Sequence, residues 1–171
     1  MQITILLLRL AHIVFGAYWF GAVAFLALFL EPSARAAGPV GGQMMAQLQR
    51  LKFSQWTMVA AALTIVSGIT LLGIDSQWFK SAWMSSHMAI ALQIGGLLAI
   101  IGAAIGSAVA RPAVARLGVI MPQLAQMAPG PEREQLDAEA KRLSGRLRSA
   151  GRTTAILIAI TVALMATARY L

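Results

Sequence analysis

The run LAHIVFGAYWFGAVAFLALFL (residues 10–30) contains no charged residue between Arg9 and Glu31. Its length matches the roughly 20 residues that a helix needs to cross the apolar part of a bilayer. The N-terminus carries one positive charge before this run, and no small-residue cleavage site precedes the run's end at Glu31. We therefore expect a retained membrane helix and not a signal peptide that is removed.

Three more uncharged runs follow along the chain. We expect spanning helices at about residues 10–30, 53–74, 81–110 and 153–168. The third run exceeds the apolar thickness, which predicts tilt or an interfacial first turn, and arginines that snorkel at both ends extend the short fourth run. With 58% hydrophobic and 12% charged residues, one four-span domain occupies all 171 positions. The sequence therefore predicts an all-α, polytopic membrane protein with four transmembrane helices in an antiparallel bundle.

Positive charges are distributed unevenly between the loops. Eleven of the 14 Lys and Arg residues lie in the first loop or in segment 111–152. By the positive-inside rule, we expect these segments in the cytoplasm and both termini in the periplasm of a bacterium, so that the protein is a multi-pass protein of the inner (cytoplasmic) membrane. Because the net charge of +8 is explained by topology, we expect the lipid bilayer as partner and no nucleic acid.

The basic loop 111–152 contains an amphipathic helix. Pro131 and the acids of the next turn are typical of a helix start, and apolar residues then recur at helical spacing: Leu136, Ala140, Leu143 and Leu147. We expect this helix to continue into the fourth span and residues 43–52 to form a helical lead into the second. The cytoplasmic side should therefore carry helical extensions.

A faint repeat relates the first and third spans. Pro32 is followed by Gly38, and Pro112 is followed by Gly118 at the same spacing. Two helical hairpins in parallel repeat would explain the offset, and so would chance, since proline and glycine often follow a helix end. We expect both spans to end at these prolines.

The sequence lacks the residues that several kinds of catalytic and metal-binding site require. The chain has no cysteine, no carboxylate inside a span, and no Walker, dinucleotide-binding or zincin motif. Thiolate metal sites, carboxylate proton relays and phosphoryl transfer are therefore not expected. The sequence leaves open whether the protein is an enzyme.

Two histidines, His12 and His87, are expected about one helical turn inside the outer interface. Ionisable groups at membrane depth indicate function by default, and a neutral imidazole can bind a metal ion or haem iron. Counted from the cytoplasmic prolines, the heights of the two rings differ by roughly 7 Å at ~1.5 Å per residue. Joint coordination is one interpretation, and hydrogen bonding of each ring to a neighbouring helix or headgroup is the other.

Other residues extend this candidate site. Met84 shares a helix face with His87, and a thioether with an imidazole suits copper or haem, although Met84 can equally be apolar filling. Phe15, Tyr18 and Trp19 beside His12 are typical either of a wall for a macrocycle or of an interfacial aromatic belt. Haem b and copper are the candidate cofactors.

Small residues predict close helix packing. They lie at Gly16 and Gly21 in the first span and at Gly95, Gly102 and Gly106 in the third. Such positions let helix backbones approach each other in lipid. They serve either packing inside the bundle or a homodimer face.

The stretches LAHIVFGAYWFG (10–21), FLEP (29–32) and AGPVGG (37–42) resemble the first span of a group of small bacterial membrane proteins. The group comprises the copper-resistance D type domain, the HemJ-type protoporphyrinogen oxidase family and several uncharacterised four-helix families. The ending MATARYL (165–171) is similar to the last of these. The resemblance implies a periplasm-side histidine site for haem b or copper with His12 as ligand. The HemJ-type family uses a lysine where this sequence has His87. Because of this difference, the resemblance does not imply the oxidase activity, but His87 can still serve as a metal ligand.

The leading hypothesis is thus an inner-membrane bundle that binds haem b or copper through His12, with His87 as candidate second ligand. The alternative is a structural or accessory membrane protein, with no catalysis and no cofactor, that acts either alone or as a homodimer.

Overall fold

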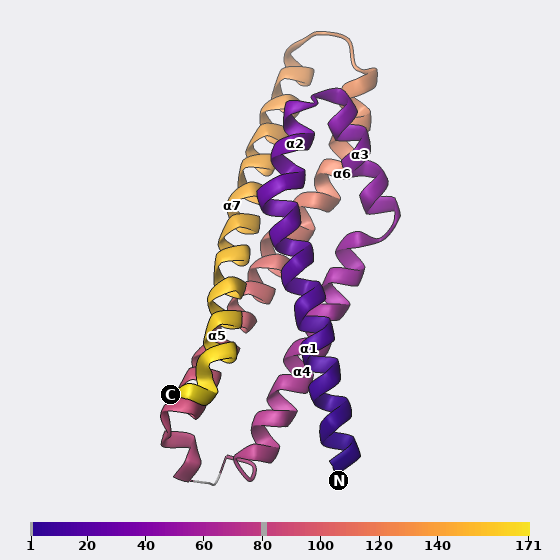
Figure 1. Ribbon diagram of the computed structural model, residues 1–171. Helices are drawn as coiled ribbons and strands as arrows, with labels where there is room; N and C mark the ends of the chain where they lie inside the picture. Colours follow the sequence, from indigo (N-terminus) through magenta and orange to yellow (C-terminus); the bar gives the residue numbers. More distant parts are fainter. Residues whose placement is uncertain (1, 80–81) are drawn as a thin grey trace.

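The computed structural model describes residues 2–79 and 82–171, a bundle of long helices with no strand in this part of the chain (Figure 1). Two π-helical segments, Leu26–Leu30 and Gly106–Ala110, and two short 3-10 turns, Ala82–Ser85 and Ala168–Tyr170, lie between or after the α-helices. The α-helices are α1 (Gln2–Phe25), α2 (Glu31–Ala36), α3 (Pro39–Arg50), α4 (Phe53–Asp75), α5 (His87–Ile105), α6 (Arg111–Gln126) and α7 (Pro131–Thr167).

The expected all-α membrane architecture is confirmed. Four helical stretches are long and apolar enough to cross a bilayer: Gln2–Ala36, Phe53–Asp75, His87–Gln126 and Pro131–Tyr170. Large apolar side chains such as Leu28 and Val66 are exposed, whereas most of the buried apolar residues are alanines. Helices in lipid pack through small residues and turn large apolar side chains to the lipid tails. The chain is therefore a multi-pass membrane protein in contact with the bilayer.

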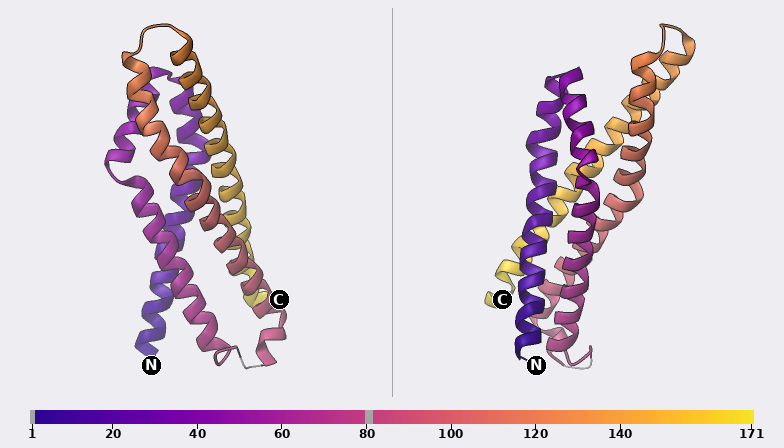
Figure 2. Two further views of the ribbon diagram at one scale, coloured as in Figure 1. Left: turned by 180° about the vertical axis from the view of Figure 1, so that it is seen from behind. Right: turned by 90° about the vertical axis from the view of Figure 1, so that its right-hand side faces the viewer.

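The helices pair as two hairpins, in which α1 packs along α4 and α5 packs along α7. Both termini lie at one end of the bundle, which we call the terminal end (Figure 1). The opposite end carries the Arg- and Lys-rich segments, and we call it the basic end. There, α6 and the first half of α7 lean away from α2 and α3 (Figure 2, right).

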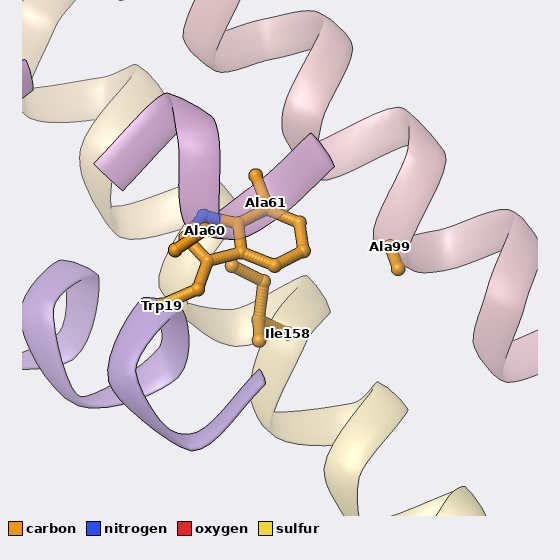
Figure 3. Packing of buried hydrophobic residues seen from close by; sticks show 5 residues of the cluster. All are labelled: Trp19, Ala60, Ala61, Ala99 and Ile158. Carbon is orange, nitrogen blue, oxygen red and sulfur yellow. The ribbon is translucent and has the colours of Figure 1, made fainter. Parts of the chain in front are cut away.

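Trp19 packs where the two hairpins meet. Its side chain, 4% exposed, contacts a cluster formed by Ala60 and Ala61 of α4, Ala99 of α5 and Ile158 of α7. Figure 3 shows the indole between the two α4 alanines and Ile158. Trp19 therefore belongs to the bundle core, and neither the interfacial belt nor the macrocycle wall describes its position. The alanines explain why, because only small side chains leave room for an indole between four helices.

The helical stretches that begin with α1 and α5 continue through the prolines at which the sequence predicted their ends, so that Pro32 lies in α2 and Pro112 in α6. The N–H of Glu31 donates to the Leu26 carbonyl, and the N–H of Arg111 donates to the Gly106 carbonyl, in each case five residues back. These wider π-turns come directly before the two prolines.

The π-turns have a physical cause in Pro32 and Pro112. Proline has no N–H to donate, and its ring clashes with the carbonyl four residues back in a regular α-helix. Widening the turn accommodates the ring without ending the helix. The helical stretches therefore end later than expected, at Ala36 and Gln126. The same register before both prolines is also what the parallel-hairpin interpretation requires.

The basic end has a small core of its own. Ile120 and Leu124 of α6 pack against Ala140 of α7, with three leucines around them. Arg116 Nε lies 2.8 Å from Glu139 Oε1 and adds an exposed ion pair. As predicted, the helix that begins at Pro131 runs without a break into the fourth span.

The lead into the second span differs from the expectation. α3 forms the expected helix, but Lys52 takes a left-handed conformation with φ of 60° and separates α3 from α4. The chain therefore changes direction there, and α3 is a separate helix rather than the start of α4.

Candidate functional site: His12 at the contact of α1 and α4

His12 lies on the face of α1 that packs against α4, and its side chain is half-buried. Its Nδ1 atom lies 2.8 Å from the backbone carbonyl oxygen of Thr64. A carbonyl oxygen can only accept a hydrogen bond, so Nδ1 must carry the proton. The contact joins residues 52 positions apart and fixes one edge of the imidazole on α4.

Ser67 adds a weaker contact on the same side of the ring. Its hydroxyl donates to the Leu63 carbonyl at 2.6 Å and approaches the Thr64 carbonyl at 3.1 Å. The Ser67 oxygen lies 3.4 Å from His12 Nδ1 and, having donated its own hydrogen, can only accept there. The proton on Nδ1 therefore faces two acceptors on α4.

Gly68 provides the space for the ring. A Cβ atom at this position would lie 2.8 Å from His12 Cε1 and 3.1 Å from Nδ1. Carbon atoms in contact normally stay about 3.5–4.0 Å apart, so even a methyl group would displace the imidazole. No motif in the sequence marks Thr64, Ser67 or Gly68; their only signal is two hydroxyl residues and a glycine at helical spacing within a span.

This arrangement decides which nitrogen of His12 is free to act. A neutral imidazole has one N–H and one lone pair, and here the N–H is held on Nδ1. The Nε2 lone pair is therefore the one that can bind a ligand. Metal-binding histidines are commonly oriented in this way, by a hydrogen bond from the other ring nitrogen to a carbonyl.

The neighbours of His12 along α1 differ on its two sides. Gly16, one turn toward the basic end, lies against the Thr64 side chain, and Trp19 follows on the same face in the core. Arg9, one turn toward the terminal end, is exposed, and no described acidic group forms an ion pair with it. The ring thus lies between a packed core and an exposed cation.

His87 has a different environment. It is the first residue of α5, which therefore begins later than the expected start at residue 81, a position outside the described residues. Ser86 caps this helix, because its hydroxyl oxygen accepts a hydrogen bond from the N–H of Ala89. His87 is exposed and lines an apolar pocket of about 330 Å³ with residues of α5 and the C-terminal part of the chain: Ile90, Ala91, Ile94, Leu164 and Leu171. Its neighbours are therefore those of the second hairpin.

The described contacts do not bring His12 and His87 together. His12 touches α4, whereas His87 shares its pocket with Leu164 of α7. Met84 lies in the turn before α5, where its carbonyl accepts a hydrogen bond from Gln93 Nε2 at 3.0 Å. In residues 2–79 and 82–171, no three His, Asp or Glu side chains gather into a metal-binding group.

The five glycines expected at helix contacts divide into two groups. An added Cβ would meet Thr64 from Gly16, Met165 from Gly95, and Ile158 from Gly102. From Gly21 and Gly106, it would meet no atom within 4 Å. The first group packs the hairpins internally, and the second faces outward from the described bundle.

Comparisons with known proteins add no family to this picture. No family model matches the chain, and no curated protein or solved structure is similar to it.

Proposed function

We propose that the chain is a bacterial inner-membrane protein that binds haem b through the Nε2 atom of His12. The observation that carries this proposal is the hydrogen bond of Nδ1 to the Thr64 carbonyl, which leaves Nε2 as the available nitrogen. Haem b, when bound, would supply a one-electron redox centre. The resemblance of residues 10–21 to the copper-resistance D and HemJ-like group supports the same ligand.

The donors near His12 fit haem better than copper. Haem needs only one axial imidazole from the protein, whereas a copper site is built from several protein ligands. The α4 groups next to His12 are a carbonyl and a hydroxyl, both at Nδ1, and a glycine whose added Cβ would lie nearest Cε1. Copper with Met84 and His87 as further ligands is the second candidate cofactor.

Arg9 supports an anionic cofactor. It precedes His12 by one helical turn, so both side chains project from the same face of α1. Haem carries two propionate carboxylates, and an arginine forms strong charge-assisted hydrogen bonds with carboxylates. Copper would gain nothing from a cation at this place.

The proposed orientation places the terminal end in the periplasm. The basic end carries eleven of the 14 Lys and Arg residues, which the positive-inside rule assigns to the cytoplasm. The His12 site then lies on the periplasmic side, with His87 as the candidate second ligand.

The test is the absorption spectrum of the protein, purified in mild detergent and recorded oxidised and reduced, together with elemental analysis of the same sample. We expect a Soret band and about one iron per chain, and His12→Ala should lose both while His87→Ala tests the second ligand. Copper without a Soret band would replace haem by the second candidate cofactor. Neither haem nor copper, even after reconstitution with both, would refute the proposal.

That last result would favour the structural alternative. The bond from His12 to Thr64 also joins α1 to α4, a role that requires no cofactor. A protein with this role alone would act as an accessory or scaffold protein, either alone or as a homodimer.

A further inference from the structure

We infer that Gly68 is a positioning residue for His12: its missing side chain opens the Thr64 carbonyl to the imidazole and thereby fixes Nε2 as the free nitrogen. The inference adds Gly68 to the ligand site of the proposed function and rests on that proposal only for its haem-binding readout.

The first step concerns the Thr64 carbonyl. In α4, this carbonyl is the helical acceptor for the N–H of Gly68, four residues on. Side chains in an α-helix tilt toward the N-terminus, so a side chain at position 68 would cover the turn that contains residue 64. With glycine at 68, the carbonyl oxygen stays open to a second donor from another helix, and His12 Nδ1 occupies that place at 2.8 Å.

The second step concerns the ring itself. One hydrogen bond fixes the position of Nδ1 but leaves the imidazole plane free to turn about it. The space that Gly68 leaves determines where the ring can lie, because a Cβ at this position would come within 2.8 Å of Cε1, 3.1 Å of Nδ1 and 3.8 Å of Nε2. Alanine at 68 would therefore push the ring off the carbonyl and free both nitrogens to exchange the proton.

The chain offers two matched controls in the same hairpin. A Cβ at Gly16 would lie 3.3 Å from Thr64 Cγ2, so Gly16→Ala disturbs the α1–α4 contact without touching the imidazole. A Cβ at Gly21 would meet nothing within 4 Å. If disturbed helix packing alone changed the imidazole, Gly16→Ala would show the same change as Gly68→Ala. If any Gly→Ala substitution in this hairpin changed it, Gly21→Ala would show it too.

The test uses the two histidines of the chain. In a His87→Gln background with ¹⁵N-labelled histidine, the nitrogen spectrum in lipid nanodiscs reports the tautomer of His12 alone. We expect a single Nδ1-protonated ring in the parent and in both controls, and a mixture of tautomers in Gly68→Ala. An unchanged tautomer in Gly68→Ala would overturn the inference. An Nε2-protonated ring in the parent would overturn it as well, even if Gly68→Ala does not fold.

Titration with haem b then separates this inference from the proposed function. Loss of an outer partner of a ligating histidine typically weakens metal binding by about 10- to 100-fold, so we expect that rise in Kd for Gly68→Ala and none for Gly16→Ala. Equal Kd values would remove the positioning role and keep haem binding. A parent that holds the single tautomer but binds no haem would keep Gly68 as the residue that orients His12 and would refute the proposed function.

Discussion

The Oε1 atom of Glu31 lies 3.1 Å from Nε of Arg148 and joins the two hairpins near the basic end, across 117 residues of sequence. Both side chains are mostly buried, with 23% and 30% exposed, and the second carboxylate oxygen of Glu31 is buried with no partner among the described residues. The pair lies one turn from Ala27, against which Gly151 packs. The hairpins are therefore held together here by charge and by close backbone approach.

Glu31→Gln should lower the free energy of unfolding in mixed micelles by about 1–3 kcal/mol, between the values typical of exposed and of fully buried pairs. The amide leaves Arg148 without its counter-charge. Lys141→Gln is the control, because its ion pair with Asp137 is exposed to solvent and should contribute little to stability. Equal losses in the two variants would contradict a structural role for Glu31.

Gly95→Leu and Gly106→Leu should differ in stability, although both glycines lie on one continuous helical stretch. Gly95 lies in α5, and Gly106 begins the π-helical segment that follows it. A Cβ at Gly95 would already lie 3.4 Å from Met165, so leucine overpacks the α5–α7 contact and should cost about 1–3 kcal/mol of stability. Gly106 faces open space, so its leucine variant should keep the stability within about 0.5 kcal/mol. Thermal unfolding compares the two.

Light scattering of Gly106→Leu tests the homodimer, which would dissociate if the outward glycine lies at its interface.

Because of the Arg116–Glu139 ion pair, the amides of α6 should lose protection from hydrogen exchange at acid pH. The hydrogen bond and the charge of Arg116 lower the pKa of the Glu139 carboxyl below its ordinary value of 4.5. A lowered pKa in the folded state means that the contribution to stability is full above the unfolded value and is lost as the pH falls through the folded one. Amide exchange in α6, corrected for intrinsic rates, should therefore be slower in the parent than in Glu139→Gln above pH 4.5, and this difference should shrink as the pH falls below 4.5. A ratio that does not change with pH would show that the pair contributes nothing.

Single cysteines can determine the orientation, because the natural chain has none to remove. Ala128→Cys lies in the loop between α6 and α7, and Ile3→Cys lies at the terminal end. In intact spheroplasts, a membrane-impermeant maleimide should label position 3 and should label position 128 only after lysis. The opposite pattern would invert the orientation inferred from the Lys and Arg distribution.

The bundle could be predicted from the sequence because hydropathy and charge act over whole segments. The continuation of the first helical stretch from α1 through Pro32 into α2 could not be predicted, since proline is typical of a helix end unless the preceding turn widens. Tryptophan is a residue type that often anchors a helix at the membrane interface. Trp19 is instead a core residue, because alanines on other helices pack around it.

For the candidate site, the sequence identified His12 but not its partner. The acceptor is the backbone carbonyl of Thr64, and a carbonyl is present at every position, so its availability depends on the glycine at 68. The relation of His12 to His87 also depends on helix pairing, because α1 packs on α4 while His87 faces α7. Hydropathy does not contain this information.

The most direct test of the central claim, that His12 Nε2 binds haem iron, is chemical rescue. His12→Gly should lose the Soret band, and free imidazole added with haem b should restore it in the repurified protein, because the added ring replaces the missing ligand. Restoration in His12→Gly is the predicted result. A Soret band that persists in His12→Gly without imidazole would contradict the assignment, since haem would then be held by another residue.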